Sequence, residues 1–161
     1  MVGKISEEIE VKVPASEAWK VYGSLQLPKI TVEGLLNQFS KYEVLQGDGS
    51  AGTIIQVFFP PGEAGPKWFK EKFTVVDEER RVKEAELVEG GFLDLGFTRY
   101  GVRLEVVEKE GKKEESVVRA TVEYELKEEA AANASLVSNE PLLTIIKLAA
   151  DYVTKNYKAS N

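Results

Sequence analysis

Glu71 and Lys83 are the two charged side chains whose positions in the sequence are best suited to chemistry. In the segment 68–75, the residues on one side of an alternating strand pattern are Phe69, Glu71, Phe73 and Val75. This side is apolar except for its carboxylate, so we expect it to face the interior of the protein. In the next strand, Lys83 shares its side with Ala85 and Leu87. A buried lysine and glutamate are costly unless they compensate each other or water reaches them.

An acidic turn at Asp77–Glu79 joins these two strands and brings the two charged side chains toward each other. Regular pairing predicts that Lys83 lies opposite Phe73 or Val75, with Glu71 roughly 5–10 Å away. Burial would lower the pKa of the lysine and raise the pKa of the glutamate, and their mutual attraction would oppose both shifts. One alternative stays open, in which Lys83 extends to the rim of the sheet and Glu71 lies at a sheet edge.

Two tyrosines also fall on inward sides of strands. Tyr100 shares its side with Val102, and Tyr124 shares its side with Val122. Either hydroxyl could donate a hydrogen bond to a ligand. The alternative is that both rings pack in the core with the hydroxyl at a rim.

The residue types that are absent exclude several kinds of site. The chain has no cysteine and no histidine, which excludes disulfides, thiolate nucleophiles, histidine bases and Cys/His zinc sites. It has no spaced aspartate cluster and no nucleotide-binding motif, so we expect neither a metal nor a cofactor. The glycine-rich stretch 47–52 lacks the Gly-Lys-Ser/Thr end of a phosphate-binding loop, and we interpret it as a turn between strands.

The charge and the N-terminal stretch bear on partners and location. The net charge is −6, from 21 basic and 27 acidic residues. Without a basic stripe, such a chain is not expected to bind nucleic acid or an anionic membrane. The sequence contains no run of about 18 apolar residues, the length needed to cross a membrane, and the charged stretch 1–13 does not resemble a signal peptide. We therefore expect a cytoplasmic protein.

The hydrophobic pattern predicts the order strand, two short helices, six strands and one long helix. The first strand covers about 5–13, and the short helices follow within 16–36. The six further strands are expected near 39–46, 53–59, 67–76, 80–89, 93–108 and 115–126. A helical period then runs through about 128–157, where Pro141 should kink or divide the helix.

These elements favour an α+β fold in which a curved, mostly antiparallel sheet packs around the long helix. The 161 residues fit a single domain, 1–161. A strongly curved sheet that holds one helix leaves a hollow, so we expect an internal apolar cavity. The residues expected to contact a ligand in it are Phe59, Phe69, Phe73, Tyr100, Val102, Leu142 and Ile146.

Several stretches resemble a known plant family. The order of elements, GDGSAGT (47–53) and EGG (89–91) are similar to the family of the major birch pollen allergen, the pathogenesis-related class ten proteins. ASEAWKVYG (15–23), FPPG (59–62) and EGGFLDLG (89–96) further resemble norcoclaurine synthase and its relatives, including norbelladine-synthase-like proteins. The resemblance extends over essentially the whole chain.

The resemblance implies a helix-grip fold, in which seven strands wrap around the long C-terminal helix and enclose a large apolar cavity. It implies binding of hydrophobic plant metabolites or hormones. For the norcoclaurine-synthase-like subgroup, it implies condensation of a phenethylamine such as dopamine with an aldehyde. That reaction proceeds through an iminium ion, followed by ring closure in the Pictet–Spengler case.

The resemblance also assigns roles to individual residues. The family's catalytic lysine falls on Lys83 and its catalytic glutamate on Glu71, the two residues that the strand pattern places inside. The family's tyrosine falls on Phe69 and its aspartate on Val102, and neither of these side chains can form a hydrogen bond. Norbelladine-synthase-like proteins also look apolar at the aspartate position, so its loss does not exclude condensation.

Two functions follow as hypotheses. In the first, the protein is a bond-forming lyase in which Lys83 protonates the carbinolamine oxygen and Glu71 accepts a proton. In the second, it is a non-catalytic carrier or storage protein, an alternative that Phe69 and Val102 favour. We favour the enzyme because the lysine and glutamate are both retained. A ribonuclease is disfavoured by the charge and the lack of histidine.

The expected partners follow from the same two hypotheses. They are small hydrophobic or aromatic molecules, either a phenethylamine and an aldehyde or a hormone or flavonoid. We expect the protein to be a monomer or a weak dimer.

Overall fold

The structure is a computed structural model that describes residues 1–62 and 64–160. Its strands are β1 (Val2–Val11), β2 (Lys41–Gln46), β3 (Ile54–Phe58), β4 (Trp68–Asp77), β5 (Val82–Gly90), β6 (Phe97–Lys109) and β7 (Lys112–Leu126). Its helices are α1 (Ala15–Tyr22), α2 (Gln26–Gly34), α3 (Asn139–Ser160) and the short 3-10 helices η1 (Gly91–Leu95) and η2 (Glu128–Leu136). The predicted α+β fold is confirmed, including the two short helices after the first strand and the long C-terminal helix.

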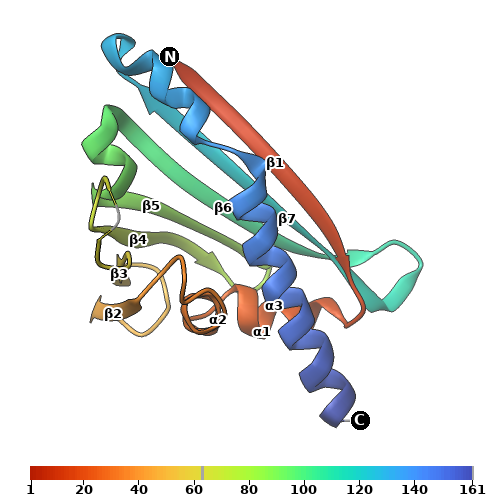
Figure 1. Cartoon of the computed structure of the whole chain (residues 1–161). Coiled ribbons are helices and arrows are strands. Elements are labelled where there is room, and N and C mark those ends of the chain that lie inside the picture. Colours follow the sequence, from red (N-terminus) through yellow and green to blue (C-terminus); the bar gives the residue numbers. More distant parts are fainter. Residues whose placement is uncertain (63, 161) are drawn as a thin grey trace.

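All seven strands form one antiparallel sheet in the order β1-β7-β6-β5-β4-β3-β2. From β2 to β7, each strand pairs with the next along the chain, as hairpin connections require. Figure 1 shows that α3 crosses one side of the curled sheet, while α1 and α2 lie together at one end of it. The chain thus wraps a sheet around one long helix.

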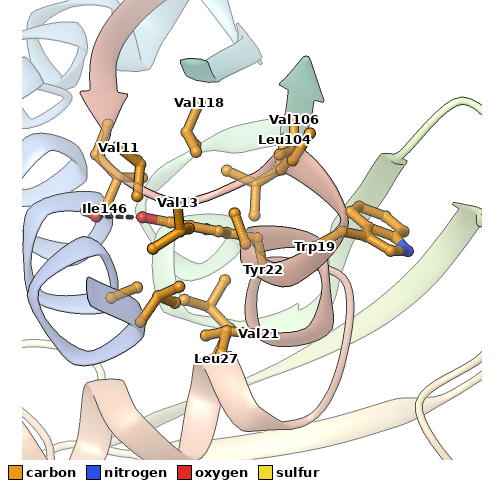
Figure 2. Packing of buried hydrophobic residues seen from close by; sticks show 14 of the residues in the cluster. Val11, Val13, Trp19, Val21, Tyr22, Leu27, Leu104, Val106, Val118 and Ile146 are labelled. Carbon is orange, nitrogen blue, oxygen red and sulfur yellow. Dashed lines mark hydrogen bonds between the residues drawn. The ribbon is translucent and has the colours of Figure 1, made fainter. Parts of the chain in front are cut away.

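A cluster of buried side chains fills the space where α1 meets α3 and the strands β6 and β7 (Figure 2). Ala15, Ala18, Trp19 and Tyr22 recur at helical spacing, so one side of α1 faces this cluster. Tyr22 is fully buried, and its hydroxyl donates a hydrogen bond of 2.6 Å to the backbone carbonyl of Ile146 on α3. This bond ties the first helix of the chain to the last.

A bulge in β4 changes which of its residues face inward. The register of β4 against β5 shifts between Phe73 and Val75, so the alternation of sides is interrupted there. Val75 was expected inside, but it is Val76 that packs against the buried core residues. Lys83 pairs with Val76, which corrects the prediction that it lies opposite Phe73 or Val75.

The segment 91–95 is a 3-10 helix, although its last residues were expected within the strand 93–108. Two glycines with positive φ flank it, Gly90 at 75° and Gly96 at 89°. Side chains other than glycine rarely adopt this conformation. A Cβ on Gly90 would also lie 2.5 Å from the carbonyl oxygen of Trp68. The chain therefore turns here, and β6 begins at Phe97.

The C-terminal segment is divided ahead of Pro141, as the sequence predicted. η2 ends at Leu136 and α3 begins at Asn139, so Pro141 lies in the first turn of α3. A proline is tolerated there because the amide hydrogen it lacks would have no partner within the helix. Ile146, Ala149 and Val153 are buried at helical spacing and turn one side of α3 toward the sheet.

Candidate functional site

A cavity of about 660 Å³ is bounded by α2, α3, η1 and residues of the strands β3 to β7. Its lining is mostly apolar, and Glu71 and Lys83 are the charged side chains among the described residues that line it. The structure places six of the expected contact residues at this cavity: Phe59, Phe69, Tyr100, Val102, Leu142 and Ile146. The hollow that the curved sheet predicted is therefore present, and its charged groups are the two identified from the strand pattern.

Phe73 is the expected contact residue that does not line the cavity. It is fully buried within its own cluster, together with Ile55, Val57 and Ala85. Its ring centroid lies 3.9 Å from the Nζ atom of Lys83. Phe73 therefore stabilises the charged form of the Lys83 amine, because the face of an aromatic ring attracts a positive charge.

Lys83 is buried on β5, with 4% of its surface exposed. It pairs with Val76 on β4 and with Leu104 on β6, so it lies in the interior of the sheet. This excludes the alternative in which its side chain extends to the rim. Burial lowers the pKa of Lys83 to about 8, and the charge of Glu71 opposes that shift. The amine can therefore change its protonation state near neutral pH.

The ammonium of Lys83 is open to the cavity. No hydrogen bond or ion pair joins it to another described residue. Every fully buried polar side-chain atom in the described part of the chain does have a partner. The Nζ atom must therefore reach the cavity, where a ligand or water can supply the partner that the protein does not.

Glu71 lies on β4, paired with Ile55 on β3 and Leu87 on β5. Because β4 is an internal strand, the alternative of a glutamate at a sheet edge is excluded. The side chain keeps some accessible surface because it lines the cavity. Burial raises the pKa of Glu71, and the nearby Lys83 ammonium opposes this rise. The carboxyl group is thus a better proton acceptor than an exposed one, and it holds its proton more tightly once protonated.

The two charged groups face the same cavity without touching each other. The inward pair of Phe73 and Ala85 lies between the pair that contains Glu71 and the pair that contains Lys83. Leu87 and Lys83 are four positions apart on β5, about 13 Å along the strand, which is farther at the backbone than regular pairing predicted. No ion pair joins the two groups within the described residues, so a reacting molecule can occupy the space between them.

Tyr100 adds a hydroxyl to the same region. It lies on β6, and its ring stacks on Phe92 with 4.6 Å between centroids. Burial and the charge of Glu71 raise the pKa of Tyr100 to about 12, so the hydroxyl keeps its proton and lies within electrostatic reach of the carboxylate. Tyr124 does not line the cavity and packs in the core, which agrees with the core-packing interpretation for this residue.

Comparison with known proteins assigns the chain to a family. The sequence profile of the "Pathogenesis-related protein Bet v 1 family" matches residues 1–156. The chain belongs to the Bet v 1 family. This agrees with the resemblance to the birch pollen allergen family that the sequence motifs carry.

Curated relatives of the chain are two kinds of synthase. It is 47% identical to norbelladine synthase of Narcissus pseudonarcissus, over 90% of this chain and 88% of that protein. It is 37% identical to S-norcoclaurine synthase 2 of Papaver somniferum, over 94% of this chain but 65% of that longer protein. The chain thus spans about two thirds of the length of the poppy enzyme.

Solved structures give the same grouping. The fold matches norcoclaurine synthase of Thalictrum flavum, solved as a point mutant with a transition-state analogue, with a TM-score of 0.86 at 35% identity. That match covers 98% of this chain and 97% of the other. A second match is the Thalictrum flavum enzyme in complex with dopamine and hydroxybenzaldehyde, with a TM-score of 0.83 at 35% identity. It covers 96% of this chain and 88% of the other.

Other kinds of site find no support in this Bet v 1 family member. Among the described residues, no group of three or more acidic, histidine or cysteine side chains could hold a metal ion. No described helix is long and apolar enough to span a membrane. In the glycine-rich stretch, the buried hydroxyl of Thr53 accepts a hydrogen bond of 2.8 Å from the amide of Gly49, as in a self-contained turn.

Sequence reasoning missed several other residues that line the cavity. They are Asn37, Gln38, Ala64, Pro66 and Ser138 from connecting segments, Leu136 from the end of η2, and Phe92 and Leu95 from η1. Residues in connections carry no strand or helix period, so no pattern indicated which way they point. The stretch 89–96 was noted as a motif, but the break expected at Gly90-Gly91 and the strand expected from 93 gave no sign of η1, which places Phe92 at the cavity.

Proposed function

We propose that this protein is an enzyme that condenses a phenethylamine with an aldehyde inside its cavity. The observation that carries the proposal is the placement of an amine of lowered pKa and a carboxyl of raised pKa around one apolar space. Paired groups whose pKa values are moved toward each other by burial are typical of acid–base catalysis. The similarity to norbelladine synthase and to norcoclaurine synthase, the latter solved with dopamine and hydroxybenzaldehyde, supports this reaction class.

The two charged groups divide the proton transfers between them. The amine nitrogen attacks the aldehyde carbon, and the Glu71 carboxylate transfers the proton that this nitrogen loses to the alkoxide oxygen, which gives a neutral carbinolamine and leaves Glu71 as a carboxylate. The Lys83 ammonium then donates a proton to the hydroxyl oxygen of the carbinolamine, which leaves as water and gives the iminium. When a ring closes, an aromatic carbon attacks the iminium carbon, and Glu71 takes the ring proton. Each such step contributes about 100- to 10,000-fold in rate.

The remaining lining holds the substrates in place. Apolar walls bring two aromatic molecules together and exclude bulk water, which otherwise competes for the iminium. Phe69 and Val102 offer only apolar contact. We therefore assign the orientation of the amine to Glu71 and the hydroxyl of Tyr100, which lies within electrostatic reach of it.

A carrier of hydrophobic metabolites is the second candidate function, and the largely apolar lining favours it. In a carrier, Lys83 and Glu71 would orient a polar group of the bound molecule without turnover. The two candidates differ in one measurable property. Removing the lysine abolishes product formation in an enzyme, whereas in a carrier it changes only the affinity for the ligand.

The deciding experiment combines dopamine with 4-hydroxyphenylacetaldehyde or 3,4-dihydroxybenzaldehyde and measures product by mass spectrometry. Lys83→Met should lower kcat/KM by about 100- to 10,000-fold. Lys72→Arg is the matched control, because Lys72 is an exposed residue of the neighbouring strand, and it should retain full activity. Equal product from wild type and Lys83→Met ends the catalytic assignment and leaves the carrier.

The cellular location and the oligomeric state of the protein are also proposed here. We propose a cytoplasmic protein that acts as a monomer or a weak dimer. Cell fractionation tests the first statement, and size-exclusion chromatography at several concentrations tests the second.

A further inference from the structure

The amine of Lys83 differs from the other lysines in its surroundings. It is the one buried charged side chain among the described residues. An exposed lysine such as Lys12 instead donates to Glu115 at 2.7 Å, which raises its pKa. With a pKa of about 8, roughly one tenth of the Lys83 amines are uncharged at pH 7, about 200-fold more than for an ordinary lysine.

An uncharged amine is a nucleophile toward carbonyl carbon, and Lys83 is the one lysine among the described residues that line the cavity. The chain contains no cysteine and no histidine. The cavity is apolar, which protects an iminium from hydrolysis by bulk water. The ring of Phe73, 3.9 Å from Nζ, attracts a cation there, and an iminium nitrogen at the same position is also a cation.

We propose that Lys83 forms a reversible covalent iminium with an aldehyde in the cavity. The lysine nitrogen attacks the carbonyl carbon to form a carbinolamine. A proton from the carboxyl group of Glu71 then converts the hydroxyl into water, which leaves. The balance is one amine, one aldehyde and one proton in, and one iminium and one water out. No oxidant or reductant takes part.

The iminium gives the protein a second route to the same product. An incoming amine attacks the iminium carbon, a proton moves from its nitrogen to the lysine nitrogen, and the bond to Lys83 breaks. The aldehyde carbon leaves as the iminium of the incoming amine, and Lys83 is regenerated. This route rests on the proposed function only in requiring that an aldehyde enter the cavity. It does not require turnover.

The test uses the aldehyde alone, without an amine substrate. The wild-type protein is incubated with 3,4-dihydroxybenzaldehyde, reduced with sodium borohydride, and measured by intact mass and peptide mapping. The expected result is one adduct per chain, with a mass gain of the aldehyde less one oxygen atom, on the peptide that contains Lys83. Labelling of Lys83 should exceed that of the exposed Lys72 by at least about tenfold, given its larger uncharged fraction.

Two variants serve as controls for the labelling. Lys83→Met should lose the adduct, whereas Lys72→Arg should keep it at the wild-type level. Thermal unfolding of both variants establishes that each is folded. The comparison of Lys83 with Lys72 within the wild-type protein tests the inference independently of either variant.

Other results overturn the inference and show which statement has failed. Label spread evenly over the exposed lysines excludes a special role for Lys83. If no adduct forms although calorimetry shows saturable binding of the aldehyde, the iminium is excluded and the proposed function survives. If neither an adduct nor binding is found, the aldehyde does not enter the cavity, and both proposals fail.

Discussion

Two regions of the molecule, the filled end around α1 and the hollow end around the cavity, treat buried polar groups in opposite ways. At the end closed by α1, the hydroxyl of Tyr22 is buried among apolar side chains and donates to the carbonyl of Ile146 at 2.6 Å (Figure 2). At the hollow end, the amine of Lys83 and the carboxyl of Glu71 face a cavity and have no such partner in the described part of the protein. Tyr22, at the filled end, has a hydrogen-bond partner within the protein, whereas Lys83 and Glu71, at the hollow end, are left open to a ligand.

This difference distinguishes buried polar groups that stabilise the fold from buried polar groups that serve a function. A buried group with a protein partner holds two elements together, as Tyr22 holds α1 to α3. A buried charge without one lowers the stability of the fold and persists where a ligand or a reaction uses it. Substitutions at the two ends should therefore change stability in opposite directions.

Lys83→Met should give the largest change and should stabilise the protein. The pKa of Lys83 is about 8 when folded, against about 10.5 for a free lysine, so its burial costs about 3 kcal/mol at pH 7. Because the folded pKa lies below the unfolded one, the cost is full below pH 8 and disappears as the pH rises past 10.5. Urea unfolding at pH 7 and pH 10 checks both the sign and the trend. A methionine variant that is less stable at pH 7 contradicts the contrast between the two ends.

Tyr22→Phe should have the opposite effect at the filled end. It removes a buried hydrogen bond without leaving a large cavity, so the free energy of unfolding should fall by about 1–2 kcal/mol. Because Tyr22 does not line the cavity, kcat should stay unchanged below the melting temperature. Tyr152→Phe, at an exposed position of α3, is the matched control and should change neither quantity. A loss of activity without a loss of stability in Tyr22→Phe would indicate that the filled end also takes part in the chemistry.

The pH dependence of kcat/KM should report the charged groups of the hollow end. Lys83 donates its proton, so the rate should fall about tenfold per pH unit above its pKa of about 8. Glu71 accepts a proton, so the rate should also fall on the acid side, at a pH above the ordinary glutamate value because burial raises its pKa. A rate that continues to rise through pH 8 would contradict the role of Lys83 as the acid.

Tyr100→Phe should give the smallest effect. Losing one hydroxyl at the cavity wall should raise KM for the amine a few-fold, with little change in kcat, as the loss of one neutral hydrogen bond predicts. Tyr124→Phe removes a hydroxyl from a core tyrosine away from the cavity and should leave KM unchanged. Equal KM values for the wild type and Tyr100→Phe exclude a contact between that hydroxyl and the amine.

Much of the fold and the central pair could be predicted from sequence because both depend on local periodicity. The alternation around Glu71 and Lys83 identified one carboxylate and one amine on apolar sides of adjacent strands. Pro141 likewise indicated where the C-terminal segment divides. These features depend on the chemistry of single residues and on the pleat of a strand.

Other features depend on contacts between distant segments and could not be predicted. The bulge at Phe73–Val75 shifts the register by one residue without any glycine or proline to mark it. Phe73 was expected to contact a ligand, because alternation gives the side of a residue but not its depth. Several residues that line the cavity come from connections, whose directions are set only by the assembled fold.

The cavity has a consequence for how substrate selectivity can change as the sequence evolves. Phe69 and Val102 turn part of their surface to the cavity and pack with the rest against core side chains, so exchanging them changes the cavity wall at the cost of some packing. The anchoring interactions, such as the bond between α1 and α3, lie elsewhere. Selectivity for one aldehyde or amine can therefore drift, or be redesigned, while the scaffold that carries it stays intact.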